Sequence, residues 1–264
     1  MLTRTLNYAP VVGRRRVYIV ERAETLTESA ANSLLKVLEE PPPYVIFILC
    51  APHPARVLPT IVSRAQMIRL IPAARQDLAT YLHTKLNVEQ SRAELYAALA
   101  EGKTGQAVSL AQTPRVSDEI ARVLDFAETI PDAPPLRALR LAEQMRKLAT
   151  QMKALTGEEG AVAGDTTDDE DSGVKDKAGR RKLAALFDLL VVFYRDLMAL
   201  SVGGAVAQQI MNRERADMLT RLSASSSTDR WIRCLDSLMI ARRRLEANAS
   251  IAMVTDVLAI TLVT

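Results

Sequence analysis

One stretch, residues 17–70, decides the expected fold, and it contains four recognisable runs: VYIVERAE (17–24), SAANSLLKVLEEPPP (29–43), YVIFILC (44–50) and PARVLPTIVSRAQ (54–66). The two β-favouring apolar runs are typical of parallel strands that are buried on both faces. Between them, apolar residues recur at helical spacing until three prolines stop the helix, and Thr25 or Thr27 is positioned to cap its start. This order predicts a right-handed, parallel β-α-β unit.

The end of the stretch predicts a short helix over residues 57–62, broken by Pro59, which carries Ser63 and Arg64 at its end. Residues 66–71 are expected to form a last strand. No phosphate loop of the form GxxxxGK[ST] occurs in the 264 residues. We therefore interpret residues 1–71 as a partial α/β core, the second half of a nucleotide-binding module that lacks the half holding its own nucleotide.

The rest of the chain has helical periodicity, so the expected fold class is α/β plus all-α. Residues 72–114 predict a small lid of three helices, and residues 115–264 predict a helical bundle interrupted at Gly203 and Gly204. An acidic segment rich in Gly, Ser and Thr suggests a disordered loop over residues 157–182, because such composition buries little apolar surface. Binding of a partner to this loop is the alternative.

Composition excludes several functional classes. With 48% hydrophobic and 25% charged residues and a net charge of +3, the chain resembles an ordinary soluble protein and not one that wraps DNA. Cys50 and Cys234 lie far apart in apolar patterns, which indicates buried thiols instead of a disulfide or metal pair. Two histidines argue against a histidine-based metal or triad site. With no signal peptide and no long apolar run, we expect a cytoplasmic protein without a membrane span.

The motifs resemble those of bacterial DNA polymerase III clamp-loader subunits of the AAA+ family. VYIVERAETLTESAANSLLKVLEEPP resembles their Walker B strand and the helix that follows, and LPTIVSRAQ resembles their Ser-Arg-Cys motif. AEGKTGQAVSL, from residue 100, resembles the sensor 2 helix of the lid. FYRDLMAL, MNRE and ARRRLEANAS are more similar to the collar domain of the delta-prime subunit than to that of the gamma/tau ATPase. The resemblance therefore implies an N-terminally shortened delta-prime subunit.

The departures from the family pattern point away from ATP hydrolysis. Where an ATPase of this family has two adjacent acids, which position Mg²⁺ and polarise water, this chain has Glu21 and Arg22, a degenerate Walker B. Pro52 follows the strand where a polar sensor 1 residue is expected, and Gln106 replaces the sensor 2 arginine. We expect no cofactor bound by this chain, with ATP and Mg²⁺ held in the neighbouring subunit.

The resemblance implies that Arg64 is an arginine finger supplied in trans to a neighbouring ATPase subunit, with Ser63 supporting its loop. From the residues alone, a Ser-Arg pair indicates a surface ion pair instead. The implied partners are the gamma/tau and delta subunits, and through the complex the sliding clamp and primed DNA. The chain would then be a non-hydrolysing, delta-prime-like component of the DNA-directed DNA polymerase III holoenzyme.

Two alternatives stay open. The chain is also compatible with a gamma/tau-like ATPase subunit that lacks its N-terminus, or with a repurposed helical scaffold. Glu39 and Glu40, just before the prolines, are equally compatible with the rim of a subunit interface and with a solvated helix end. Acids at a helix C-terminus are mildly unfavourable, because they face the negative end of the helix dipole.

Overall fold

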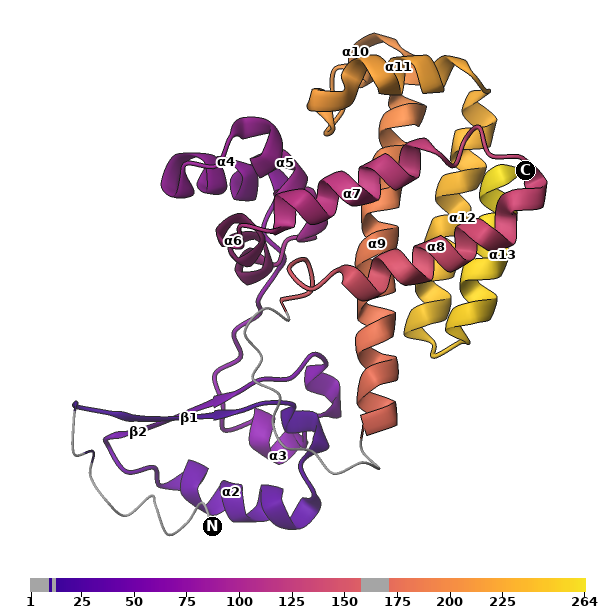
Figure 1. Ribbon diagram of the computed structural model, residues 1–264. Helices are drawn as coiled ribbons and strands as arrows, with labels where there is room; N and C mark the ends of the chain where they lie inside the picture. Colours follow the sequence, from indigo (N-terminus) through magenta and orange to yellow (C-terminus); the bar gives the residue numbers. More distant parts are fainter. Residues whose placement is uncertain (1–9, 11–12, 158–170) are drawn as a thin grey trace. The chain divides into compact units, whose positions relative to one another are not determined.

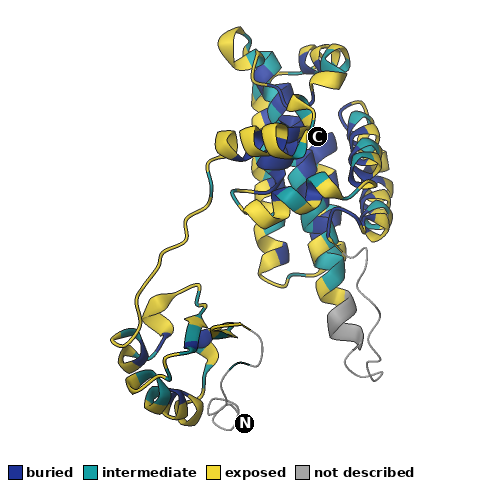
Figure 2. Cartoon of the chain, turned by 90° about the vertical axis from the view of Figure 1, so that its left-hand side faces the viewer, coloured by how far each residue is buried: buried dark blue, intermediate teal, exposed yellow. Residues whose placement is uncertain are grey.

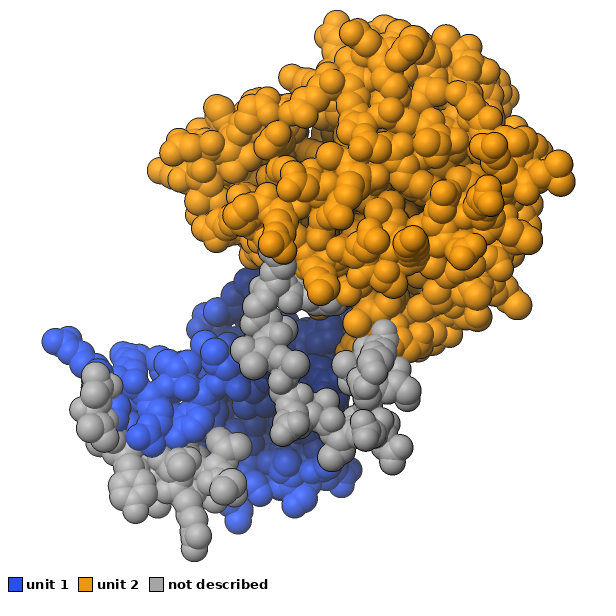
Figure 3. Space-filling model, in the orientation of Figure 1, with its two compact units in different colours: residues 1–71 blue, residues 72–264 orange. Residues whose placement is uncertain are grey.

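The computed structural model describes Pro10, residues 13–157 and residues 171–264 (Figure 1). The chain divides into two compact units, Met1–Ile71 and Pro72–Thr264 (Figure 3). The described residues are mostly helical, with one two-stranded parallel sheet in the first unit. Of the helices in these ranges, none is both long enough and apolar enough to cross a membrane.

The first unit contains, in order, β1 (Arg16–Val20), η1 (Ala23–Thr25), α2 (Glu28–Glu39), β2 (Val45–Leu49), η2 (Pro54–Arg56) and α3 (Pro59–Val62). The strands pair in parallel, with Tyr18 opposite Phe47, so the predicted β-α-β unit is confirmed. Thr27 caps α2 by accepting a hydrogen bond from the backbone N–H of Ala30, whereas Thr25 donates its hydroxyl to a backbone carbonyl. Pro59 starts α3 at its first position instead of breaking it.

The expectation that both faces of this sheet are buried is wrong for the described residues. One face packs against α2 and α3 around a small core of Ala23, Ala31, Leu34, Val57 and Ile61. On the opposite face Val17 and Ile19 of β1 are 50% and 64% exposed. The strand predicted over residues 66–71 is also wrong, since this segment is extended without a strand partner and Leu70 is 90% exposed. An apolar run shows that a strand favours burial, but in the described part of this unit helices pack against only one face of the sheet.

In the described residues of the second unit, every regular element is a helix. The unit contains α4 (Arg75–Leu86), α5 (Gln90–Leu99), α6 (Thr104–Gln112), α7 (Val116–Glu128), η3 (Pro135–Arg137), α8 (Ala138–Gln151), α9 (Asp171–Val202), α10 (Gly204–Ala207), η4 (Arg213–Arg215), α11 (Ala216–Ala224), α12 (Thr228–Glu246) and α13 (Ile251–Val263). One apolar core runs through it, with α9 packed against α7, α8, α11 and α12 (Figure 2). As predicted, the helices are interrupted at Gly203 and Gly204: α9 ends just before Gly203, α10 begins at Gly204, and both glycines adopt positive φ.

The predicted acidic loop over residues 157–182 needs a correction. Residues 158–170 lie outside the described residues, but residues 171–182 belong to α9 and are therefore not a loop. Basic residues explain the helix: Arg180 pairs with Asp176 one turn earlier and donates to the carbonyl of Ala249, and Arg181 donates to the carbonyl of Thr156. The contacts of Arg180 and Arg181 hold this part of α9 against Ala249 and Thr156. A second correction concerns Cys50, which is exposed, whereas Cys234 is buried as expected.

Two buried carboxylates organise the turns of the helical unit. Glu119 of α7 accepts hydrogen bonds from three consecutive backbone N–H groups, those of Lys153, Ala154 and Leu155. Asp196 of α9 is fully buried and accepts from the backbone N–H groups of Met211 and Asn212 and from the Asn212 side chain. Each carboxylate thereby satisfies backbone donors that have no helical partner.

Candidate functional site

Ser63 and Arg64 lie directly after α3, where the sequence placed them. Helix α3 is anchored by Ile61, whose side chain is 1% exposed. The Ser63 hydroxyl donates to the carbonyl of Thr60 at 3.0 Å, and its backbone N–H donates to the carbonyl of Pro59. Ser63 therefore closes the last turn of α3 and sets the direction in which the chain leaves it.

The Arg64 guanidinium is held at one end by three acceptors. Nη2 donates to Oε1 of Glu39 at 2.8 Å, and Nη1 donates to the carbonyl of Thr60 at 3.2 Å and to Oγ of Ser63 at 3.5 Å. The side chains of Arg64 and Glu39 are 39% and 52% exposed. The surface ion pair expected from the residues alone is thus present, and the guanidinium is accessible to solvent at the same time.

The residues that follow the two strands meet at one edge of the sheet. The backbone N–H of Ala23 donates to the carbonyl of Cys50 at 2.9 Å, which brings the turn of Glu21 and Arg22 beside the segment after β2. Glu21 and Arg22 are both exposed, and Arg22 adopts a left-handed conformation with φ of 51°. A non-glycine residue in this region is uncommon, so the turn is tightly constrained. Gln106, for which the resemblance implies the sensor 2 position, lies in α6 of the second unit.

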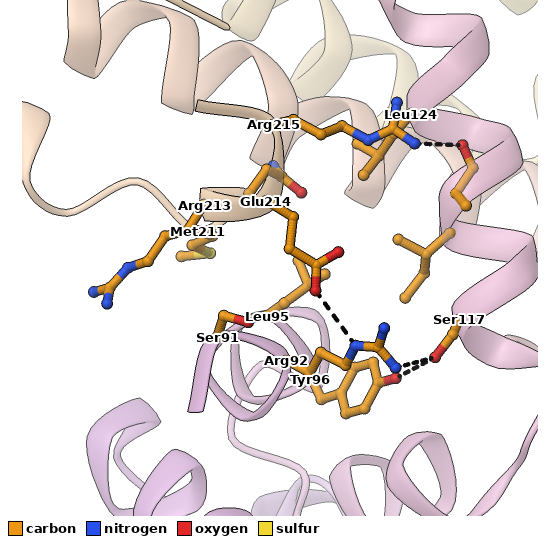
Figure 4. A pocket seen from close by; sticks show the side chains of 13 residues that line it. Ser91, Arg92, Leu95, Tyr96, Ser117, Leu124, Met211, Arg213, Glu214 and Arg215 are labelled. Atoms are coloured by element: carbon orange, nitrogen blue, oxygen red, sulfur yellow. Dashed lines mark hydrogen bonds and ion pairs between the residues drawn. The ribbon is translucent and has the colours of Figure 1, made fainter. Parts of the chain in front are cut away.

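The second unit contains a charged pocket, lined by residues of α5, α7 and η4, that sequence reasoning did not predict (Figure 4). Its volume is about 80 Å³. Each of its three arginines faces a carboxylate: Arg92 lies 3.6 Å from Glu214, Arg213 lies 3.3 Å from Glu94, and Arg215 pairs with Asp125 and Glu128. Because these cations are already paired, the pocket joins helices and offers little to an anionic ligand.

A second charged network, also not anticipated, centres on Arg242 of α12. Its Nε lies 2.6 Å from Oδ1 of Asp188 on α9, and it also pairs with Glu101, between α5 and α6, and with Glu246. Burial raises the pKa of Asp188 from 3.8 to about 6, although the Arg242 charge opposes that rise. The network ties the residues before α6 to the long helices.

Comparison with known proteins shows a similarity that lies mainly in the first part of the chain. Residues 1–74 match the family model described as DNA polymerase III, delta subunit. The DNA polymerase III subunit gamma/tau of Mycobacterium tuberculosis is 49% identical over 67 residues, which cover 25% of this chain and 12% of that protein. The delta' subunit of Escherichia coli is 36% identical over 111 residues, which cover 42% of this chain and 33% of that protein.

The matches span at most a third of the length of these relatives. Among solved structures, a DNA polymerase III gamma subunit-related protein from Thermotoga maritima is 18% identical, with a TM-score of 0.41, over 92% of this chain and 77% of that one. The sequence matches confirm the resemblance to subunits of bacterial DNA polymerase III. They include both delta' and gamma/tau subunits, so the choice between these classes has to come from the residues.

Proposed function

We propose that this chain is a non-hydrolysing, delta-prime-like subunit of a DNA polymerase III clamp loader, and that Arg64 acts in trans on ATP held by a neighbouring gamma/tau subunit. The observation that carries the proposal is that Arg64 is both exposed to solvent and held in place. Its side chain is 39% exposed, and yet its guanidinium is fixed at one end by the end of α2 and by α3. A residue that must meet a second protein has to combine these two properties.

The chemistry of the guanidinium suits the role. Arginine carries five N–H donors in a planar fork and stays charged, so it can share two hydrogen bonds with phosphate oxygens while its other donors are occupied. An arginine finger stabilises the charge that builds on the transferred phosphoryl group and is worth roughly 10³-fold or more in rate. ATP and Mg²⁺ would be held by the neighbouring subunit, and this chain would supply one charge to that site.

The turn after β1 supports the non-hydrolysing part of the proposal. Arg22 occupies the position of the second Walker B acid, and a cation there would repel Mg²⁺ and could not polarise water. The left-handed backbone of Arg22 holds it at an exposed turn beside Cys50. The proposed partners are the gamma/tau and delta subunits, with the sliding clamp and primed DNA engaged through the whole complex.

A gamma/tau-like ATPase subunit is the second candidate, because the 49% identity to a gamma/tau subunit exceeds the 36% identity to a delta' subunit. That higher identity is measured over the shorter segment. Hydrolysis of ATP by the isolated chain does not separate the two candidates, because these 264 residues contain no phosphate loop. The residues favour the delta-prime-like candidate, since a gamma/tau-like ATPase needs two adjacent Walker B acids and this chain has Glu21 and Arg22.

The test is reconstitution of this chain with the delta and gamma/tau subunits of the same organism, scored for hydrolysis of ATP stimulated by clamp and DNA. We expect Arg64→Ala to lower the rate at least tenfold while the complex still assembles, as judged by size-exclusion chromatography. Arg56→Ala is the matched control, since Arg56 is an exposed arginine of the same unit at the end of η2. An unchanged rate for Arg64→Ala would refute the finger. A chain that fails to assemble would favour the repurposed scaffold.

A further inference from the structure

We propose that Glu39 is the positioning residue of Arg64, which holds the guanidinium in the orientation it needs for the nucleotide of the neighbouring subunit. This inference rests on the proposed function of Arg64. Glu39 is the last residue of α2 and lies 25 positions before Arg64 in the sequence. Its carboxylate oxygen Oε1 lies 2.8 Å from Nη2 of Arg64.

Both partners stand on anchored elements. Helix α2 buries Ala31 and Leu34, and α3 buries Ile61, in the same small apolar core. The end of α2 and the end of α3 are therefore fixed relative to each other. An arginine side chain has four rotatable bonds, and an unpaired, exposed one samples many rotamers. A carboxylate fixed at this distance restricts that freedom before any phosphate arrives.

The contacts also leave donors for a substrate. Glu39 and Thr60 accept from Nη2 and Nη1, so they occupy the terminal nitrogens of the fork. The Nε–H group makes no hydrogen bond within the described residues, and Nη2 has a second N–H besides the one that Glu39 accepts. These two donors are left for the oxygens of a phosphate.

The position of Glu39 is otherwise unfavourable. It lies in the last turn of α2, where a carboxylate meets the negative end of the helix dipole, and three prolines follow Glu40. The ion pair with Arg64 offsets that repulsion. Glu40 is next to Glu39 and exposed, and its side chain makes no ion pair or hydrogen bond in the described part of the chain. Glu40 is therefore a matched control for charge and location.

The experiment measures kcat and KM for ATP in the reconstituted complex with Glu39→Ala, Glu40→Ala, Arg64→Ala and the Glu39→Ala, Arg64→Ala double variant. An ion pair this exposed is weak, so Glu39→Ala should lower kcat about threefold to fivefold and leave KM unchanged. Glu40→Ala should change neither constant. In the Arg64→Ala background, Glu39→Ala should have no further effect, because a positioning residue has nothing left to position.

Three outcomes would overturn the inference. If Glu39→Ala raises kcat, the carboxylate competes with the phosphate and does not position the arginine. If Glu39→Ala has no effect, or the same effect as Glu40→Ala, the pair is incidental. If Glu39→Ala lowers the rate equally with and without Arg64, Glu39 acts on assembly. These results are separate from failure of the proposed function, which would appear as an unchanged rate in Arg64→Ala alone and would remove both proposals.

Discussion

Replacing Asp188 by asparagine should remove a pH dependence from the stability of the helical unit. Asp188 lies on α9 with its side chain 24% exposed and faces the guanidinium of Arg242 at 2.6 Å. Burial disfavours the charged carboxylate and raises its pKa from 3.8 to about 6, more than the nearby arginine lowers it. Asparagine keeps the shape of the side chain but cannot titrate, so it isolates this one group.

The sign follows from proton binding. Between about pH 4 and pH 6 the folded chain binds a proton at Asp188 more tightly than the unfolded chain does. The stabilisation from this group is therefore complete below pH 3.8 and is lost as the pH rises through about 6. One pKa unit corresponds to about 1.4 kcal/mol. The shift thus predicts a loss on the order of 3 kcal/mol in the free energy of unfolding between about pH 4 and pH 7.

Urea unfolding followed by tryptophan fluorescence provides the assay. Trp231 is the single tryptophan of the chain, is fully buried and lies in the same unit, so its signal reports that unit. The stability of the parent chain minus that of Asp188→Asn should fall by about 3 kcal/mol from pH 4 to pH 7. Asp236→Asn, which removes an exposed carboxylate of α12, is the matched control. A flat difference for Asp188→Asn, or a rising one, would show that Arg242 dominates over burial and would refute the reasoning.

Three further predictions follow from burial and geometry. Asp196→Ala leaves the buried backbone N–H groups of Met211 and Asn212 without an acceptor. It should lower the free energy of unfolding by about 3–5 kcal/mol in urea titrations. A loss below ~1 kcal/mol would show that these hydrogen bonds do not stabilise the fold. Gly102→Ala should lower the free energy of unfolding by at least about 1 kcal/mol in the same assay. The glycine has φ of 83°, and an added Cβ would lie 2.4 Å from Cβ of Pro72. An unchanged stability would show that the turn relaxes. In thiol titration with a chromogenic disulfide, the exposed Cys50 should react in the native chain. Cys234 should react only after denaturation, because burial raises the pKa of its thiol to about 11. Two fast thiols in the native chain would contradict this prediction.

Local signals in the sequence predicted the parts of the fold that local chemistry decides. The β-α-β unit follows from two apolar runs separated by a helical pattern, and the prolines stop α2 because they cannot donate backbone hydrogen bonds. The helices are interrupted at Gly203 and Gly204 because both residues adopt positive φ, which glycine tolerates at no steric cost. Each of these signals acts within a few residues, so no knowledge of the tertiary structure was needed.

Predictions failed where the answer depends on distant residues. An apolar strand pattern indicates that both faces of the strand favour burial, but it does not indicate whether other elements pack against both faces. In the described residues, one face of β1 is exposed. The acidic composition extended the expected loop to residue 182, although Arg180 and Arg181 bind carbonyls of Ala249 and Thr156 and hold those residues in α9. Average composition over a window misses such specific long-range contacts. The carboxylate of Glu119 was missed for the same reason.

Arg64 shows how two interpretations of one residue can be compatible. From the sequence, a surface ion pair and an arginine finger were alternatives, yet an ion pair at 2.8 Å leaves the Arg64 side chain 39% exposed. Exposed pairs contribute only about 0.2–1 kcal/mol, so the contact with Glu39 can orient the side chain without withdrawing its charge. A phosphate carries more charge than a carboxylate and meets the arginine in a site with less water, where the attraction is larger. The ion pair is therefore no evidence against the finger, and only the rate of the assembled complex can decide between an arginine that acts and one that is merely paired.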